Sequence, residues 1–292
     1  MNKARRRFLI GTASLLLALG RTRAGAPAFP VIRIGLTPVI LDDRSLFLQH
    51  WRRWLEHRLG APVEFVQRQR YRDITELLLD GSLTAAWICG YPYVRHRNRM
   101  RLLAAPVYRG EPLYRSLIVS GRQDGDTASF EQLAGKVFAY SDPDSNSGYL
   151  YPVYRLREQL LGNPQLFRRA FFTWGHRNTV EAVARGLADG GAVDGYVWET
   201  LVDQHPWYAE RVQVIEQSPK FGFPPLVTRR DLPEEMHRQL AETLFAMQHD
   251  LQGSELLRTL QLDRFQPGDD EDYAGIARMM EAINALERNP VA

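Results

Sequence analysis

The chain lacks the features on which several protein classes depend. Its 292 residues contain one cysteine, Cys89, so no intramolecular disulfide can form. The sequence has no GxxxxGK[ST] nucleotide loop, no HExxH zinc pair and no GxSxG nucleophile elbow. It also shows no internal repeat and no low-complexity segment. These absences argue against a disulfide scaffold, a P-loop enzyme, a zinc protease and a serine hydrolase of the elbow type.

Little net charge remains once the first residues are set aside. Residues 1–20, MNKARRRFLIGTASLLLALG, join a basic start to an apolar run too short to span a bilayer comfortably, as is typical of a targeting segment. The paired arginines before Phe8 and Leu9 resemble the twin-arginine export signature, with an ordinary secretory signal as the alternative. Removal of residues 1–26 leaves 31 basic residues against 34 acidic ones, a net charge of about −3. We therefore expect a periplasmic protein and no binding to nucleic acid.

Strand and helix signals alternate along the first part of the mature chain. Apolar runs predict strands at 31–36, 62–67 and 85–89, and spacing near 3.6 residues predicts helices at 46–59 and 71–79. This β-α-β-α-β order predicts an α/β protein with a mostly parallel sheet and ligand sites at the carboxyl ends of its strands.

A second unit of the same kind follows, and the chain then returns to the first. Strands are expected at 137–140, 170–173 and 192–197, and helices at about 149–161 and 178–187. Extended segments at 117–119 and 223–228 lead out and back, before helices at 233–252, 255–260 and 271–286. The expected organisation is a leader at 1–26, a first lobe at 27–116 and 225–292, and a second lobe at 117–224.

Three short polar side chains stand in a row at the start of an expected helix. The stretch SDPDSNSG, residues 141–148, places Ser145, Asn146 and Ser147 before Gly148. At a helix N-terminus the unpaired backbone N–H groups and the positive end of the dipole favour an anion, and a glycine lets the backbone come close. A plain N-cap is the alternative, but a cap needs one such residue rather than three. The run indicates an oxyanion site.

Together with GYPYV and GHRNTVEAVARGLADGGAVDGYVWE, this loop resembles the periplasmic binding proteins of phosphate, phosphite and phosphonate ABC transporters. The resemblance covers about residues 32–280, and the Ser-x-Ser-Gly loop with its preceding Asp-Pro is its specific element. It implies a two-lobed periplasmic-binding-protein architecture of type 2, with a ligand cleft between lobes joined by two extended hinge crossings.

The resemblance also implies roles for single residues and a class of ligand. Residues 145–148 would wrap the oxyanion, and Tyr71, Tyr91 and His176 would lie near it. The alternative for His176 is a histidine with a purely structural role. Asp194 would be structural. Aminophosphonate binders carry an acidic residue where this chain has Arg177. A guanidinium suits an anionic or neutral-polar group on the ligand. The alternative is that Arg177 is a surface residue at the start of a helix. Trp198 replaces a second polar position and could pack on a small apolar part of the ligand.

Cys89 has two interpretations. It follows an apolar strand and precedes the Gly-Tyr pair, where an inert buried thiol is the ordinary case. A thiolate there could instead bind a soft oxyanion such as arsenite, and the protein would then signal to a membrane histidine kinase, as a relative within the family does. The full set of expected ligand-binding residues is Thr37, Tyr71, Cys89, Tyr91, Ser145, Asn146, Ser147, Gly148, His176, Arg177 and Trp198, with no catalytic residue, metal ligand or cofactor.

The expected function is capture of a small oxyanion by closure of the cleft and delivery to an ABC permease in the inner membrane. Closure follows because only the closed state offers the ligand contacts from both lobes. A monomer is expected, and catalysis is not, because no nucleophile is evidently activated by a neighbour.

Overall fold

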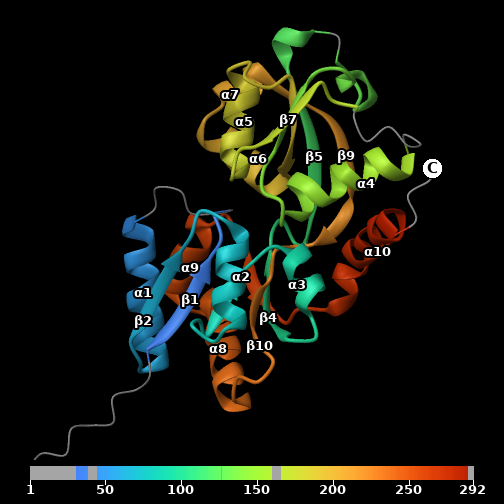
Figure 1. The fold of residues 1–292 in the computed structure, drawn as a ribbon. Coiled ribbons are helices and arrows are strands. Elements are labelled where there is room, and N and C mark those ends of the chain that lie inside the picture. The colour runs from blue at the N-terminus through green and yellow to red at the C-terminus, as the bar shows by residue number, and fades with distance from the viewer. Residues whose placement is uncertain (1–30, 39–44, 126, 160–165, 289–292) are drawn as a thin grey trace, which may run out of the picture.

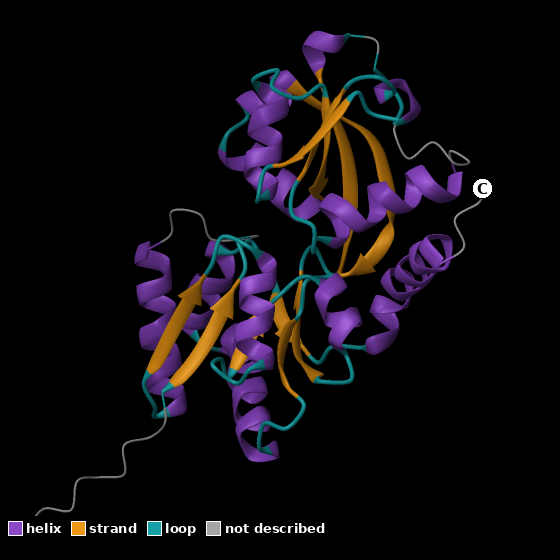
Figure 2. Ribbon diagram, in the orientation of Figure 1, coloured by secondary structure: helices purple, strands orange, loops and turns teal. Residues whose placement is uncertain are grey.

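The computed structural model describes residues 31–38, 45–125, 127–159 and 166–288. Its chain forms two α/β lobes, which lie one above the other in Figures 1 and 2. The expected leader at 1–26 falls outside the described residues, as does the end of the helix expected at 149–161. No helix in the described ranges is long and apolar enough to cross a membrane.

The first lobe is built on a sheet with strand order β11-β4-β10-β3-β1-β2. Strand β1 pairs in parallel with β2 and β3, and β10 runs antiparallel between β3 and β4. The strands are β1 (Ile32–Leu36), β2 (Val63–Gln67), β3 (Ala85–Trp87), β4 (Met100–Val107), β10 (Leu226–Arg229) and β11 (Arg264–Gln266). The helices are α1 (Ser45–Leu59), α2 (Tyr71–Leu79), α3 (Gly90–His96), α8 (Glu234–Ala246), α9 (Leu251–Thr259) and α10 (Ala274–Arg288).

The second lobe is built on a sheet with strand order β7-β6-β8-β5-β9. Strand β6 pairs in parallel with β7 and β8, whereas β5 pairs antiparallel with β8 and β9. The strands are β5 (Leu113–Gly121), β6 (Val137–Tyr140), β7 (Arg169–Phe172), β8 (Gly190–Asp194) and β9 (Val212–Gly222). The helices are α4 (Tyr151–Gln159), α5 (His176–Ala184), α6 (Gly195–Gln204) and α7 (Trp207–Arg211), with a π-helical turn at Asn146–Leu150 before α4.

Each lobe has an aromatic core. In the first lobe, Trp87 packs edge-on against Trp51 at 6.0 Å and against Phe265 at 5.7 Å. In the second lobe, Phe138 stacks on Phe167 with ring centroids 4.3 Å apart. Buried aromatic pairs of this kind add about 0.5–1.5 kcal/mol each beyond the area they bury. These aromatic groups belong to one set of buried hydrophobic residues that continues through both lobes.

The chain crosses between the lobes at 108–112 and at 223–225, where it leaves one sheet and enters the other. The expected lobe boundaries fall at 116/117 and 224/225, so the first change of sheet lies a few residues earlier than the sequence suggests. Helix α10 contacts both α3 and α4, so it touches the two lobes (Figure 1).

Two expected strands end earlier than their apolar runs do. The strand expected at 192–197 ends at Asp194, because the Asp194 carboxylate accepts hydrogen bonds from the backbone N–H groups of Tyr196 and Val197 and so starts α6. Likewise, β3 ends at Trp87, and Cys89 is the residue that precedes α3.

Candidate functional site

The SDPDSNSG loop folds tightly around Gly148. Ser145 caps the π-helical turn, since its hydroxyl accepts a hydrogen bond from the backbone N–H of Gly148 at 3.0 Å. A Cβ atom on Gly148 would lie only 1.7 Å from Ser141 Oγ and 3.0 Å from His176 Cε1. Only glycine fits this position, and its close contacts hold the row of polar side chains against β6 and α5.

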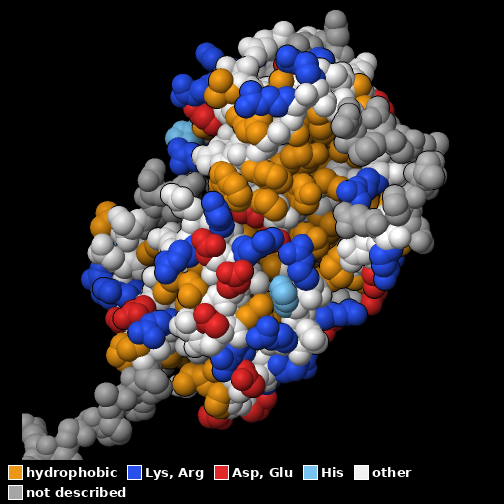
Figure 3. Space-filling model, viewed as in Figure 1, with side chains coloured by type: hydrophobic (Ala, Val, Ile, Leu, Met, Phe, Trp, Pro, Cys, Tyr) orange, Lys and Arg blue, Asp and Glu red, His pale blue; other side chains and the backbone are white. Residues whose placement is uncertain are grey.

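Two aspartates of the same loop join the second lobe to the first. Asp142 accepts a hydrogen bond from the backbone N–H of Tyr71, the first residue of α2, at 3.2 Å. Asp144 forms ion pairs with Arg95 at 2.6 Å and Arg72 at 3.4 Å. In Figure 3, charged side chains of both signs gather on the lower lobe, beneath the hydrophobic surface of the upper lobe. The lobes are thus closed on each other at this loop.

Cys89 of the first lobe and Tyr114 at the start of β5 also contact this loop. The Cys89 sulfur accepts a hydrogen bond from the backbone N–H of Asn146 at 3.2 Å, and the Asn146 side-chain amide donates to the Tyr114 hydroxyl at 3.0 Å. The Ser147 hydroxyl lies beside that of Tyr114 without the geometry of a hydrogen bond. Burial raises the pKa of the Cys89 thiol to about 11, so it remains protonated at neutral pH.

The buried polar side chains around the loop form one cluster, made of Tyr71, Cys89, Tyr114, Ser141, Ser145, Asn146, Ser147 and His176. His176 is a neutral hydrogen-bond donor in this cluster. Its Nδ1 accepts a hydrogen bond from the backbone N–H of Asp194 at 3.1 Å, and burial lowers its pKa to about 3. A neutral imidazole has one N–H, which must then be on Nε2. This Nε2 lies 3.4 Å from Ser145 Oγ, so His176 donates to Ser145. Because Ser145 already accepts from Gly148 and His176, its own hydroxyl proton is free to be donated elsewhere.

Buried polar atoms without a partner concentrate here. In the described part of the chain, five buried side-chain polar atoms have no hydrogen-bond partner, and four of them belong to this cluster. These four are Tyr71 OH, Ser141 Oγ, Asn146 Oδ1 and Ser147 Oγ. Each such atom costs roughly 1–3 kcal/mol if it stays unpaired, so a native protein leaves few of them. Their grouping between the two lobes marks a site that a small polar ligand would satisfy.

Helix N-termini surround the same cluster. Tyr71 begins α2, Ser145 caps the turn that leads into α4, His176 begins α5, and Asp194 caps α6. Each N-terminus carries about half a positive charge and directs backbone N–H groups outward. The loop and these termini together suit an anion.

The structure brings together most, but not all, of the expected ligand residues. Residues 145–148, Tyr71, Cys89 and His176 belong to the buried cluster. Thr37 lies at the end of β1, where its hydroxyl donates to the carbonyl of Trp87 at 3.1 Å. Tyr91 is half-buried on α3, and the guanidinium of Arg95 lies 4.2 Å from its ring centroid. The side chains of Thr37 and Tyr91 are thus directed at partners outside the cluster.

Arg177 and Trp198 lie apart from the serine loop. Arg177 is near Tyr208 on α7 and Glu181 on α5. Desolvation opposes ionisation of the Glu181 carboxyl, but hydrogen bonds from Tyr208 and Arg185, with a smaller contribution from the charge of Arg177, lower its pKa. Because residues 195–204 form a helix rather than the end of a strand, Trp198 lies about one turn into α6. It lines a pocket of about 320 Å³ at the hinge, together with Tyr108 and Tyr114.

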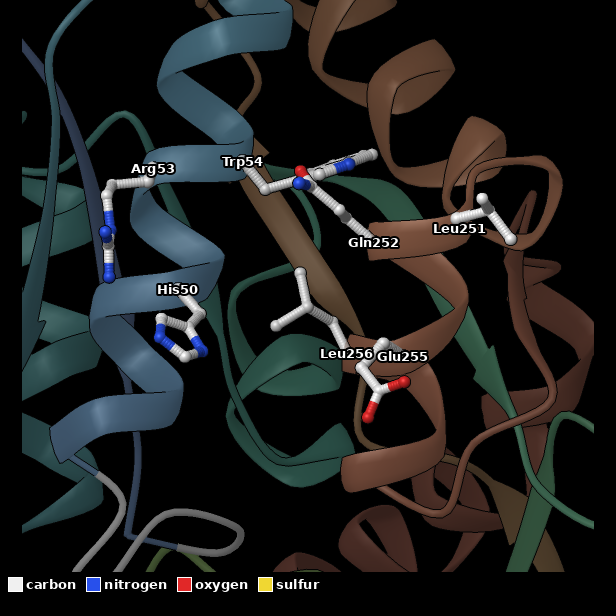
Figure 4. A pocket seen from close by; sticks show the side chains of 7 residues that line it. All are labelled: His50, Arg53, Trp54, Leu251, Gln252, Glu255 and Leu256. Carbon is white, nitrogen blue, oxygen red and sulfur yellow. The ribbon is translucent and has the colours of Figure 1, made fainter.

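A second pocket lies away from the expected ligand residues. A pocket of about 530 Å³ lies between α1 and α9 in the first lobe, and its walls include His50, Trp54 and Leu256 (Figure 4). None of the expected ligand residues lines it. Within the residues that the structure describes, no group of three His, Cys, Asp or Glu side chains is placed to hold a metal ion.

A family model described as "ABC transporter, phosphonate, periplasmic substrate-binding protein" matches residues 34–273. The chain belongs to this family. The matched residues include the whole of the cluster, from Tyr71 to Asp194, and most of both lobes, without α10.

Individual members of the family are similar to this chain over different lengths. The phosphate-import protein PhnD of Mycolicibacterium smegmatis is 30% identical over 162 residues, which span 51% of this chain and 50% of that protein. The match therefore covers about half the length of this curated relative.

Solved structures share the fold. A binding protein component of an ABC phosphonate transporter from Pseudomonas aeruginosa superposes with a TM-score of 0.78 at 24% identity, covering 86% of this chain and 85% of the other. PhnD1 from Prochlorococcus marinus, solved with methylphosphonate, gives 0.78 at 19% identity, covering 87% and 98%. These likenesses confirm the two-lobed α/β architecture that the resemblance implied.

The sequence does not indicate three residues of the cluster. Tyr114 lies on β5, in the segment assigned to the first lobe, and no local pattern marks it. Ser141 and Asp144 stand within the quoted loop, but the atoms they meet, on Gly148 and on two arginines of the first lobe, depend on the tertiary fold. The only available signal is the Asp-Pro-Asp run before the serines.

Proposed function

We propose that this phosphonate-family protein captures a small phosphorus oxyanion, such as phosphite or an alkylphosphonate, and delivers it to an ABC permease in the inner membrane. The observation that carries the proposal is the group of unpartnered polar atoms on Tyr71, Ser141, Asn146 and Ser147 between the lobes. Hydroxyls of this kind, beside helix N-termini, can donate to ligand oxygens without a side-chain cation.

Closure would couple binding to delivery. The loop contacts the first lobe through Asp142 and Asp144, so the complete cluster exists only when the lobes meet. A ligand that contacts both lobes stabilises the closed state by the difference between its affinities for the closed and open states. The permease would then recognise the closed form. The family description supports a periplasmic location, and we extend it to a mature monomer released from its leader.

The carboxylates near the cluster, rather than Arg177, support a preference for ligands without an amine. Arg177 lies away from the cluster, so it takes no part in this choice. The carboxylates of Asp142 and Asp194 already accept backbone N–H groups, which leaves them poorly placed to hold an ammonium group.

Binding, rather than catalysis, also fits the histidine. Ser145, His176 and Asp194 adjoin one another, but the proton on His176 Nε2 points at Ser145, so the imidazole cannot take the serine's proton. The Asp194 carboxylate caps α6 and does not orient the histidine.

A thermal-shift panel on reduced residues 27–292 tests the proposal. Phosphite, methylphosphonate, 2-aminoethylphosphonate, phosphate, sulfate and arsenite would be compared, because a ligand of the native state raises the melting temperature. A rise with phosphite or methylphosphonate, and a smaller one with the amine, is expected. A rise with arsenite alone, abolished by Cys89→Ser, would replace transport of phosphorus compounds with thiol-based sensing.

A further inference from the structure

Side-chain cations are missing from the centre of the cluster. Among the described residues no lysine or arginine is buried, and the nearest arginines named above, Arg72 and Arg95, are paired with Asp144. Arginine in bidentate contact is over-represented where proteins recognise carboxylates and phosphates. Here the positive contribution comes from backbone dipoles alone.

The titratable groups that face the cluster come from every element around it, and they are neutral or acidic. Tyr71 on α2, Tyr114 on β5 and Cys89 before α3 all have pKa values raised by burial, and His176 on α5 has a lowered one, so all four are uncharged at neutral pH. The remaining two are carboxyls. Burial raises the pKa of Asp142, in the loop, and that of Asp194, before α6, the latter to about 7.

These contributions can be compared in units of charge. The four helices that begin at the cluster supply about half a positive charge each. The carboxyls of Asp142 and Asp194, when ionised, cancel about as much, and the third buried carboxyl, that of Asp144, is paired with Arg72 and Arg95 at the edge of the loop. The cluster is therefore close to electrically neutral, and every additional negative charge on a ligand raises the cost of moving it out of water.

A second observation, independent of charge, concerns Asn146. Its amide nitrogen donates to the Tyr114 hydroxyl at 3.0 Å, which leaves Oδ1 buried and without a partner, like Tyr71 OH, Ser141 Oγ and Ser147 Oγ. A hydroxyl can either donate or accept, but an amide oxygen can only accept. A dianionic phosphonate offers acceptors only. A monoanion retains one P–O–H group, and this group is a donor that Oδ1 can accept.

We propose that this site, assuming it is the oxyanion site proposed above, selects the singly charged, protonated form of its ligand, with Asn146 Oδ1 accepting the P–O–H proton. The ligand class narrows accordingly to phosphorus oxyanions that still hold a proton near neutral pH. A permanent dianion of similar size, such as sulfate, meets the same hydroxyls but leaves Oδ1 unsatisfied.

Titration calorimetry from pH 5 to pH 9 tests this selection, with phosphite and methylphosphonate as ligands. Affinity should fall about tenfold per pH unit above the second ionisation of each ligand, because one proton is required for binding. Phosphite is the stronger acid in that step, so its affinity should begin to fall at the lower pH. Constant affinity, affinity that rises with pH, or one common midpoint for both ligands would overturn the inference.

The bound proton can be counted and located. Above the ligand's second ionisation, titrations in two buffers of different ionisation enthalpy should show uptake of about one proton per ligand bound. Affinity can change in Asp194→Asn, which removes one of the charges counted above, but uptake of a proton should persist, because asparagine still caps α6 and Asn146 Oδ1 still accepts from the ligand. No uptake, or uptake that disappears in Asp194→Asn, would contradict the assignment to the ligand. If neither phosphorus anion bound at any pH, the proposed function itself would fail.

Discussion

Replacing Gly148 by alanine should disable the loop that holds the expected oxyanion. The new Cβ would lie 1.7 Å from Ser141 Oγ and 2.6 Å from Ser141 Cβ, and Ser141 is itself fully buried. Overpacking of this kind costs about 1–3 kcal/mol of folding free energy. The displaced turn would also move Ser147 away from the ligand. We therefore expect urea unfolding to show a free energy of unfolding lower by that amount, and calorimetry to show no detectable binding of methylphosphonate.

A control variant and a second-site rescue variant test the reason given for this prediction. Gly121 also lies in the second lobe, at an ordinary φ of −71°, and a Cβ added there would lie 3.6 Å from its nearest neighbours, so Gly121→Ala should be tolerated. Adding Ser141→Gly to Gly148→Ala removes the two shortest contacts and should recover part of the stability. If Gly148→Ala alone bound ligand and unfolded like the wild type, the close packing of this loop would not matter, and the reasoning would be refuted.

Three further predictions concern single side chains. Ser147→Ala should leave the free energy of unfolding within about 0.5 kcal/mol of the wild type, because the hydroxyl has no protein partner among the described residues. The same change should weaken phosphonate binding by about 1.5–3 kcal/mol in calorimetry. Unchanged affinity would remove this serine from the site. Asp144→Asn should weaken closure of the lobes by only about 1 kcal/mol, since both partner arginines are partly in solvent. Small-angle scattering should then show a more open ligand-free protein, and an unchanged scattering profile would contradict a role of Asp144 in closure. The buried Asp194 and His176 should give opposite pH dependence of stability. The raised pKa of Asp194 removes stability as pH rises from about 4 to about 7, whereas the lowered pKa of His176 removes stability as pH falls below about 6.5. Melting curves of Asp194→Asn and His176→Gln should therefore slope in opposite directions between pH 4 and pH 6.5, and parallel slopes would count against both assignments.

Much of the site is predictable because its parts are local. The helix at 71–79 and the serine run at a helix N-terminus follow from apolar spacing, capping chemistry and one glycine, all visible within a few residues. The parallel pairs that β1 and β6 form with their neighbours place the starts of several helices at one edge of each sheet. The prediction of a mostly parallel sheet was wrong, because β10, β11, β5 and β9 pair antiparallel with their neighbours.

What the sequence could not supply depends on contacts between distant segments. Residues 192–197 are apolar enough for a strand, and the cap by Asp194 that turns them into a helix becomes decisive only where the chain must leave the sheet. The resemblance suggests Arg177 as a ligand contact, with a surface residue at a helix start as the alternative. Successive helical residues point about 100° apart, and Arg177 lies near Tyr208. The partners of Asp144 lie 72 and 49 residues away, beyond any local pattern.

The central claim is that the loop of Ser145 and Ser147 closes, with Tyr71, on an oxyanion. The most direct test is a crystal structure of residues 27–292 grown with methylphosphonate. The account predicts phosphonate oxygens within hydrogen-bonding distance of those three hydroxyls, with the lobes still joined through Asp142. A ligand bound instead in the pocket between α1 and α9, beside His50, would contradict it.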